Sequence, residues 1–145
     1  MKKTTFIFLA VVVLFSCKKD PKNDPQSCTI STASISGPYK ITAVTYKANA
    51  TAAEQDFFNT LFVDACRRDD VYTFKEDGTY KLTDAGTVCS PSGDDNGTWT
   101  LSGTATMQID GDDAAIESFD CKKLILVNTD IDLPGDKMKI TMTRQ

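Results

Sequence analysis

Apolar and polar residues alternate with a period of two over most of the chain after residue 37, a pattern typical of strands with one buried face. The predicted strands are Tyr39–Tyr46, two segments on either side of Glu76-Asp77-Gly78, Gly97–Leu101, Thr104–Ile109, Ala115–Cys121, Leu124–Val127 and a last strand around Met138–Thr143. Short connections rich in Gly or Asp separate them. Eight short strands at hairpin spacing predict an all-β fold, an antiparallel up-and-down barrel or a compact sandwich. Eight strands close into a barrel whose interior is filled or holds one small ligand.

The two segments around Glu76-Asp77-Gly78 predict a hairpin and its register. A two-residue Asp-Gly loop would mix apolar and polar side chains on each face. A three-residue loop, with Gly78 in the left-handed region, pairs Phe74 with Tyr80 and Tyr72 with Leu82. All four side chains then point to one buried face, so we expect the longer loop.

Four of the five cysteines form an even set that predicts two disulfides in an exported protein. The hairpin register brings Cys66 close to Cys89, which leaves Cys28 to pair with Cys121 by exclusion. A zinc site is the alternative, but the chain has no closely spaced cysteine pair of the kind zinc sites use. We expect no metal and no cofactor.

The segment Thr51–Arg68 departs from the strand pattern and predicts the single helix, between the first and second strands. Thr51 and Glu54 have the spacing of a capping box. A helical apolar stripe follows, made of Phe57, Phe58, Leu61, Phe62 and Ala65. The stripe either covers the sheet or forms a lid over a cavity, in which case Phe58 and Phe62 would line the entrance for a ligand.

The N-terminus has the features of an export signal. Lys2 and Lys3 precede an apolar run, residues 6–15, that is too short to span a bilayer. The run ends in Leu14-Phe15-Ser16-Cys17, which resembles the lipobox of bacterial lipoproteins. This resemblance implies that residues 1–16 are removed and that Cys17 carries the lipid anchor. An ordinary signal peptide cleaved elsewhere is the alternative.

Residues 17–36 read as the lipidated cysteine and a flexible tether, and residues 37–145 as one barrel domain. Lys18 is not the aspartate that retains lipoproteins in the inner membrane, so we expect an outer-membrane protein. The charged stretch behind Cys17 is either a signal for export to the cell surface or a plain spacer. The domain therefore faces the periplasm or the exterior.

Charge and composition exclude several functions. Removal of the signal takes away Lys2 and Lys3, which leaves 14 basic and 20 acidic residues and a net charge of −6. Nucleic acid is therefore not an expected partner. The chain has no histidine, the side chain most often used as a general base near neutral pH. No nucleophile and base can be paired, so we expect a protein that is not an enzyme.

Two further groups of residues are candidates for a site. Acidic residues cluster around 69–70, 94–95 and 110–113, but their spacing is not that of an EF-hand, and solvated turns explain them. Nothing places two carboxylates across a cleft for glycoside cleavage. Five aromatic residues form either a ligand-contacting wall or part of the core: Tyr39, Tyr72, Phe74, Tyr80 and Trp99.

The chain resembles the lipocalin-like domain of small Bacteroidota lipoproteins. The residues that carry the resemblance are Cys66, Asp69-Asp70 before Val71-Tyr72-Thr73-Phe74, Asp77-Gly78-Thr79-Tyr80, Cys89 and Gly97-Thr98-Trp99. It covers residues 37–145 and implies an exported barrel, with no ligand residues to carry over. Gly37 and Tyr39 stand where lipocalins proper have Gly-x-Trp.

Three classes of function follow from these observations. The barrel and helix favour a carrier of a small apolar or amphipathic ligand. The anchor, tether and lack of a site motif favour an envelope accessory module, which presents its surface to a protein or glycan. An enzyme has the least support. We expect a lipid-anchored, monomeric binding or accessory module, and an interior cavity above about 300 Å³ would favour the carrier.

Overall fold

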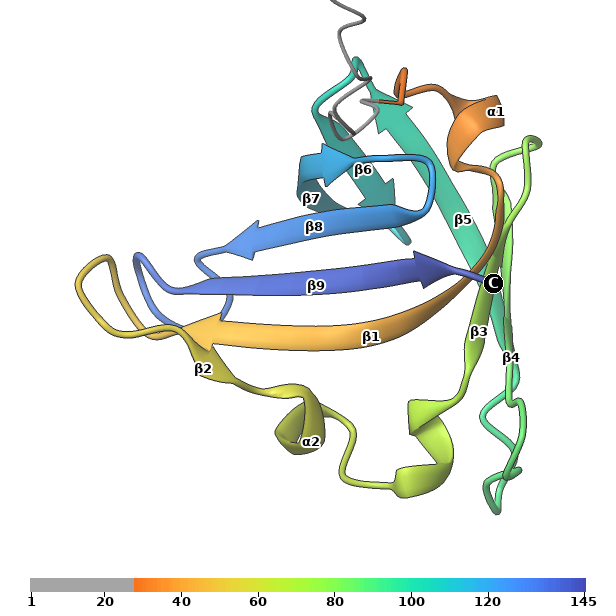
Figure 1. The fold of residues 1–145 in the computed structure, drawn as a ribbon, viewed down its shortest axis with the longest axis horizontal. Helices are drawn as coiled ribbons and strands as arrows, with labels where there is room; N and C mark the ends of the chain where they lie inside the picture. The colour runs from red at the N-terminus through yellow and green to blue at the C-terminus, as the bar shows by residue number, and fades with distance from the viewer. Residues whose placement is uncertain (1–27) are drawn as a thin grey trace, which may run out of the picture.

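The computed structural model describes residues 28–145, which form a β-barrel with little helix (Figure 1). Its elements are α1 (Thr32–Ile35), β1 (Gly37–Lys47), β2 (Gln55–Asp56), α2 (Phe58–Leu61), the 3-10 helix η1 (Ala65–Arg68), β3 (Val71–Phe74), β4 (Thr79–Thr83), β5 (Asp95–Ser102), β6 (Thr106–Ile109), β7 (Asp112–Phe119), β8 (Lys123–Thr129) and β9 (Lys137–Arg144). The predicted signal peptide, the anchor Cys17 and most of the predicted tether lie outside the described residues.

The barrel closes because β1 pairs with both β3 and β9. The sheet order from β3 to β9 follows the sequence, every pairing is antiparallel, and β2 is a short addition on the edge of β1. The prediction of an eight-stranded up-and-down barrel is therefore confirmed. β1 pairs with β3 only from Gly37 to Lys40, whereas its pairing with β9 extends to Lys47. The later half of β1 thus turns away from β3.

The predicted hairpin and its register are confirmed in β3 and β4. Phe74 lies opposite Tyr80 and Tyr72 opposite Leu82. Gly78 has a φ of 83°, a conformation that favours glycine, and its N–H donates to the carbonyl of Lys75. The three-residue loop therefore places all four side chains against the core.

Both disulfides join the cysteines that were predicted to pair. Cys66 in η1 bonds to Cys89 in the β4–β5 connection, and Cys28 bonds to Cys121 in the β7–β8 turn. Each pair has a Cα–Cα distance of 5.3 Å, within the usual range for disulfides.

The predicted helix over Thr51–Ala65 is wrong. Thr51 belongs to a turn in which the side chain of Asn49 accepts its N–H, and Glu54 accepts the hydroxyl of Thr45 on β1. The chain then forms β2, the four-residue α2 and η1. Together, α2 and η1 lie in the space between β1 and β3 (Figure 1), so the segment covers the side of the barrel where those two strands separate.

Residues 28–36, predicted to be tether, belong to the folded domain. Ser31 and Ser34 cap α1 reciprocally, and Ile35 is fully buried in the core. Arg144 on β9 donates to the carbonyl of Ser34 and to the hydroxyl of Tyr39, and its guanidinium lies 5.0 Å from the centre of the Tyr39 ring. These contacts seal one end of the barrel.

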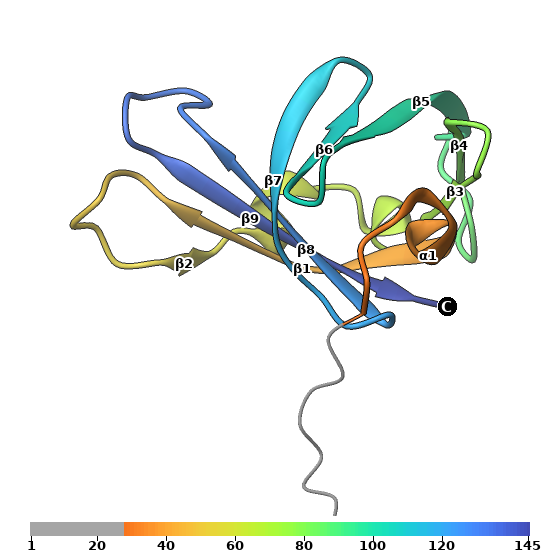
Figure 2. The same cartoon turned by 90° about the horizontal axis from the view of Figure 1, so that it is seen from above.

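The strand register defines two ends of the barrel. The end that α1 covers, called the closed end below, also has the short β3–β4, β5–β6 and β7–β8 turns. The open end has the β1–β2 and β8–β9 connections, the α2–η1 segment, the β4–β5 connection and the β6–β7 turn. In Figure 2, the β1–β2 and β8–β9 connections project away from α1 and the C-terminus.

Most of the largest fully buried side chains lie toward the closed end, whereas Val44 and Asp136 lie toward the open end. The largest fully buried side chains are Trp99, Tyr39, Phe74, Ile35, Met107, Leu124, Val44 and Asp136. Other apolar side chains that pack against this core are only half-buried: Ile41, Tyr72, Leu82, Leu101, Ile109, Ile116 and Ile140. Packing is therefore uneven within the core cluster.

Candidate functional site

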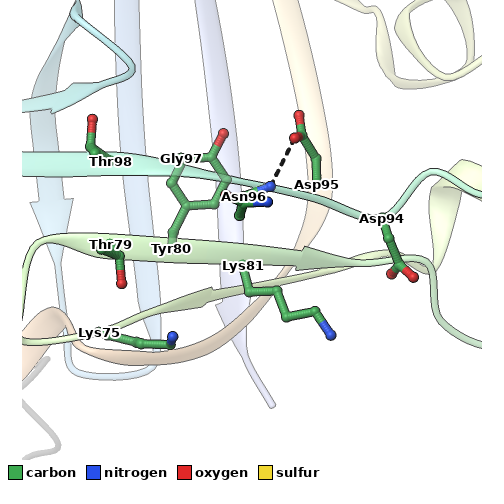
Figure 3. A pocket seen from close by; sticks show the side chains of 9 residues that line it. All are labelled: Lys75, Thr79, Tyr80, Lys81, Asp94, Asp95, Asn96, Gly97 and Thr98. Carbon is green, nitrogen blue, oxygen red and sulfur yellow. Dashed lines mark hydrogen bonds between the residues drawn. The ribbon is translucent and has the colours of Figure 1, made fainter.

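A hollow of about 540 Å³ lies across β4 and β5. We call it the β4–β5 groove (Figure 3). It is lined by Lys75, Thr79, Tyr80, Lys81, Asp94, Asp95, Asn96, Gly97 and Thr98. Its volume is within the range of ligand sites, but most of its side chains are polar.

The groove follows from the pairing of β4 with β5. Thr79 lies opposite Thr98 and Lys81 opposite Asn96, and between these pairs Tyr80 lies opposite Gly97. Because side chains alternate between the two faces of a sheet, the Thr–Thr and Lys–Asn pairs share one face and Tyr80 lies on the other. Tyr80 packs against the core, so the Thr–Thr and Lys–Asn pairs are on the outside of the barrel.

Charged side chains of both signs border the groove. Figure 3 shows Lys75, Lys81 and Asp94 extending to the same side of the strands. None of the four ion pairs among the described residues includes these three side chains or that of Asp95. Asp95 instead accepts the N–H of Asn96 at 2.8 Å. The two ammonium groups are thus available to a ligand.

A rigid contact lies behind the groove. The hydroxyl of Tyr80 donates to Asp110, whose other carboxylate oxygen accepts the N–H of Thr98 at 2.8 Å. Burial and this hydrogen bond raise the pKa of Tyr80, and the same bond together with the Thr98 N–H lowers the pKa of Asp110. A Cβ on residue 97 would overlap both Tyr80 and Asp110, so this position requires glycine.

A set of buried carboxylates holds the β4–β5 connection next to the groove. Asp84 accepts the N–H groups of Cys89 and Gly93, and the Gly93 N–H in particular lowers its pKa. Asp70 is only 8% exposed, and one of its carboxylate oxygens has no hydrogen-bond partner. Burial raises the pKa of Asp70, and the charges of Asp84 and Asp69 raise it further.

The predicted aromatic residues of a ligand wall lie mostly in the core. Phe74 contacts Trp99 and Tyr80, with ring centroids 5.4 and 6.0 Å apart. The indole N–H of Trp99 donates to the carbonyl of Lys75. Tyr72 is half-buried beside Tyr80. The structure brings these side chains together through packing, and their role as ligand contacts stays a prediction.

Phe58 and Phe62, the predicted entrance residues, are also together, with ring centroids 5.2 Å apart. They line a hollow between α2, β1 and β3 with Ile41 and Tyr72 among its other residues. Its volume is about 10 Å³, which is about the space for one water molecule. Phe58 and Phe62 therefore fill this part of the barrel wall.

Within residues 28–145, no three His, Cys, Asp or Glu side chains are arranged to hold a metal ion. The same part of the chain contains no helix with the length and apolar character needed to cross a membrane. Of the groove residues, the sequence indicated Tyr80 as a candidate ligand contact and Asp94 and Asp95 as part of an acidic cluster that solvated turns explain. The polar lining of the groove is found only when Thr79 and Lys81 on β4 are aligned with Thr98 and Asn96 on β5. That alignment requires the register of the two strands.

A closed eight-stranded antiparallel barrel with a short helix at one end is the architecture of lipocalin-like proteins. The chain matches the family described as the lipocalin-like domain over residues 35–140, and it belongs to that family. No curated protein matches the chain.

Proposed function

We propose that this protein is a non-catalytic accessory module of the cell envelope that binds a hydroxyl-rich ligand, such as a glycan, in the β4–β5 groove. The observation that carries the proposal is the location of the large hollow. It lies outside a barrel whose largest core side chains are fully buried. This favours the accessory module over the carrier of an internal guest.

The chemistry of the lining supports a saccharide. Thr98 and Asn96 offer a hydroxyl and an amide, which both donate and accept hydrogen bonds, as sugar hydroxyls do. The hydroxyl of Thr79 donates to Asp77 and offers an acceptor. Lys75 and Lys81 would attract an acidic substituent on the sugar. No aliphatic side chain lines the groove and the ring of Tyr80 is buried, so a fatty ligand would gain little from entering it.

The place of action is part of the same proposal. The short apolar run before Cys17 and the lipobox-like Leu14-Phe15-Ser16-Cys17 support lipidation and outer-membrane attachment, of the kind seen in Bacteroidota lipoproteins. In this proposal Cys17→Ala releases the protein from membranes. A variant that still partitions into detergent like the parent would exclude the anchor.

The groove is tested by screening the full chain against immobilised bacterial envelope glycans and measuring the affinity of any hit by calorimetry. Lys81→Ala and Asn96→Ala should each weaken binding by about five- to tenfold, because each removes one hydrogen-bonding group. Lys123→Ala is the matched control, since Lys123 is an exposed lysine on β8 away from the groove. An equal loss of glycan affinity in Lys81→Ala and Lys123→Ala would show that binding depends only on the net charge of the protein.

A carrier of an apolar ligand is the second candidate. It is favoured by the half-buried inner side chains, including Ile109 and Ile140. An environment-sensitive fatty-acid probe should bind with one-to-one stoichiometry if the carrier is correct. Replacing Phe58 and Phe62 with Asp would then remove binding in a folded protein, whereas in a purely packed wall the two charges would unfold it.

A further inference from the structure

The large apolar side chains that the described residues expose lie at the open end of the barrel. They are Leu61, Val63, Val88, Ile131 and Leu133. Val63 is 76% exposed and Val88 63% exposed. We use the name open-end rim for the connections that form this end, residues 48–70, 84–94, 110–111 and 130–136. Single exposed apolar residues scattered over a protein surface are ordinary. Here all five lie at one end of the barrel, which is not ordinary.

The same rim is strongly acidic. Its connections contain 11 acidic and two basic residues, whereas the closed-end segments, residues 28–36, 75–78, 103–105 and 120–122, contain three acidic and two basic residues. Even the buried Asp136 stays ionised, because backbone N–H groups outweigh the effect of burial and lower its pKa. The rim therefore combines apolar side chains with a negative field.

The exposed apolar side chains are held in fixed positions. Val63 precedes Cys66 by three residues and Val88 precedes Cys89 by one, so the disulfide joins the segments that carry them. Arg68 donates to the carbonyls of Phe62 and Val63. In the β8–β9 connection, Asp136 accepts the N–H groups of Ile131 and Leu133. An ordered surface loses less entropy when a partner binds.

We propose that the open-end rim docks a protein partner whose contacting surface is basic and apolar. The exposed valines would be buried, and Lys or Arg side chains of the partner would face the rim carboxylates. A second copy of the chain would bring two acidic rims together, and an anionic membrane surface would be repelled in the same way. This surface is separate from the glycan site proposed above, and the two proposals stand independently.

The test uses the full chain in detergent and a synthetic helical peptide of lysines and leucines as the probe. We expect saturable binding that weakens as salt rises, with hydrogen-exchange protection in residues 57–70 and 84–94. Combining Val63→Ser with Val88→Ser should weaken binding at least about tenfold, because each substitution removes apolar surface that the partner would bury. Asp64→Lys should weaken it about threefold to tenfold.

The matched control is Glu76→Lys, which makes the same charge change in the exposed β3–β4 turn at the closed end. Its effect should be at most about twofold. A loss equal to that of Asp64→Lys would overturn the proposal, since net charge alone would then explain binding. Equal binding of a glutamate–leucine peptide, or no binding of either peptide, would also overturn it. Protection of the rim by anionic lipid nanodiscs without peptide would identify a membrane surface instead and equally overturn it.

Discussion

The two ends of this barrel are built from different interactions. At the closed end, Ile35 of α1 and Tyr39 of β1 are fully buried, Arg144 covers the Tyr39 ring, and Cys28 is bonded to Cys121. At the open end, long connections are held by carboxylates that accept backbone N–H groups, such as Asp84 and Asp136. The closed end therefore contributes stability through burial, while the open end keeps polar and apolar side chains exposed in an ordered arrangement.

The contrast between buried and exposed regions predicts that a substitution in the buried aromatic cluster lowers the stability of the protein most. Trp99→Ala should lower the free energy of unfolding by about 3 to 5 kcal/mol, because Trp99 is 1% exposed and its loss leaves a cavity and removes the hydrogen bond from its indole to the carbonyl of Lys75. Val88→Ala at the open-end rim should change it by less than about 0.5 kcal/mol. Urea denaturation of both variants measures the contrast, and similar losses would contradict it.

The two disulfides give the next contrast. Removing either bridge, by Cys28→Ser with Cys121→Ser or by Cys66→Ser with Cys89→Ser, should cost about 2 to 5 kcal/mol. The bridges span 93 and 23 residues, so chain entropy predicts that the closed-end bridge contributes about 1.2 kcal/mol more. Thermal unfolding of the two double variants shows which bridge contributes more to stability. A larger loss from the open-end pair would mean that local strain or packing dominates.

A smaller and more local effect is expected for Asp136. Asp136→Ala removes the acceptor of three backbone N–H groups and of the Tyr46 hydroxyl. We expect a loss of about 1 to 3 kcal/mol, and faster hydrogen exchange confined to residues 130–136. Asp132→Ala, which changes an exposed neighbour, is the control and should have little effect. Faster exchange throughout the barrel would contradict a local role.

The smallest expected effect is the contribution of Asp70 to the pH dependence of stability. Its raised pKa means that the protonated form is favoured by folding, so this stabilisation is complete below the unfolded pKa and is lost as pH rises through the folded pKa. At neutral pH, Asp70→Asn should therefore raise stability by less than about 1 kcal/mol, because it removes a buried negative charge that lies beside the charges of Asp84 and Asp69. The gain should disappear in acid. Denaturation at several pH values measures it, and a loss at neutral pH would refute the assignment.

Local patterns predicted the fold well where neighbouring strands are joined by short turns. The alternation around Gly78 was sufficient for the β3–β4 register, and the register was sufficient for the Cys66–Cys89 bridge. Both depend on residues close in sequence, so the period of the side chains and the turn geometry determine them.

The helix over Thr51–Ala65 failed for a tertiary reason. Its apolar residues do not share one face, because Phe57 packs on Tyr46 of β1 while Phe58 lies beside Phe62 in the space between β1 and β3. Glu54 forms an ion pair with Lys139 on β9 rather than capping a helix. The separation of β1 from β3 leaves a space that the segment fills, and a helical periodicity cannot reveal that space.

The β4–β5 groove could not be predicted for a related reason. Its two strands are connected by residues 84–94, a length that does not determine a register, so Tyr80 could not be aligned with Gly97 beforehand. The four-residue α1 was missed because its capping box uses Ser34 in place of the usual Glu or Gln.

The location of the chain ends has a consequence for protein engineering. The N–H of Cys28 donates to the carbonyl of Phe119, and the N–H of Arg144 donates to the carbonyl of Lys122, so both ends of the described chain meet at the β7–β8 turn. A fluorescent domain fused after Gln145 would therefore sit beside the entry of the N-terminal segment and leave the rim unobstructed. A short linker between these ends, with new termini at the exposed Gly103 turn, would give a circular permutant that keeps every strand intact.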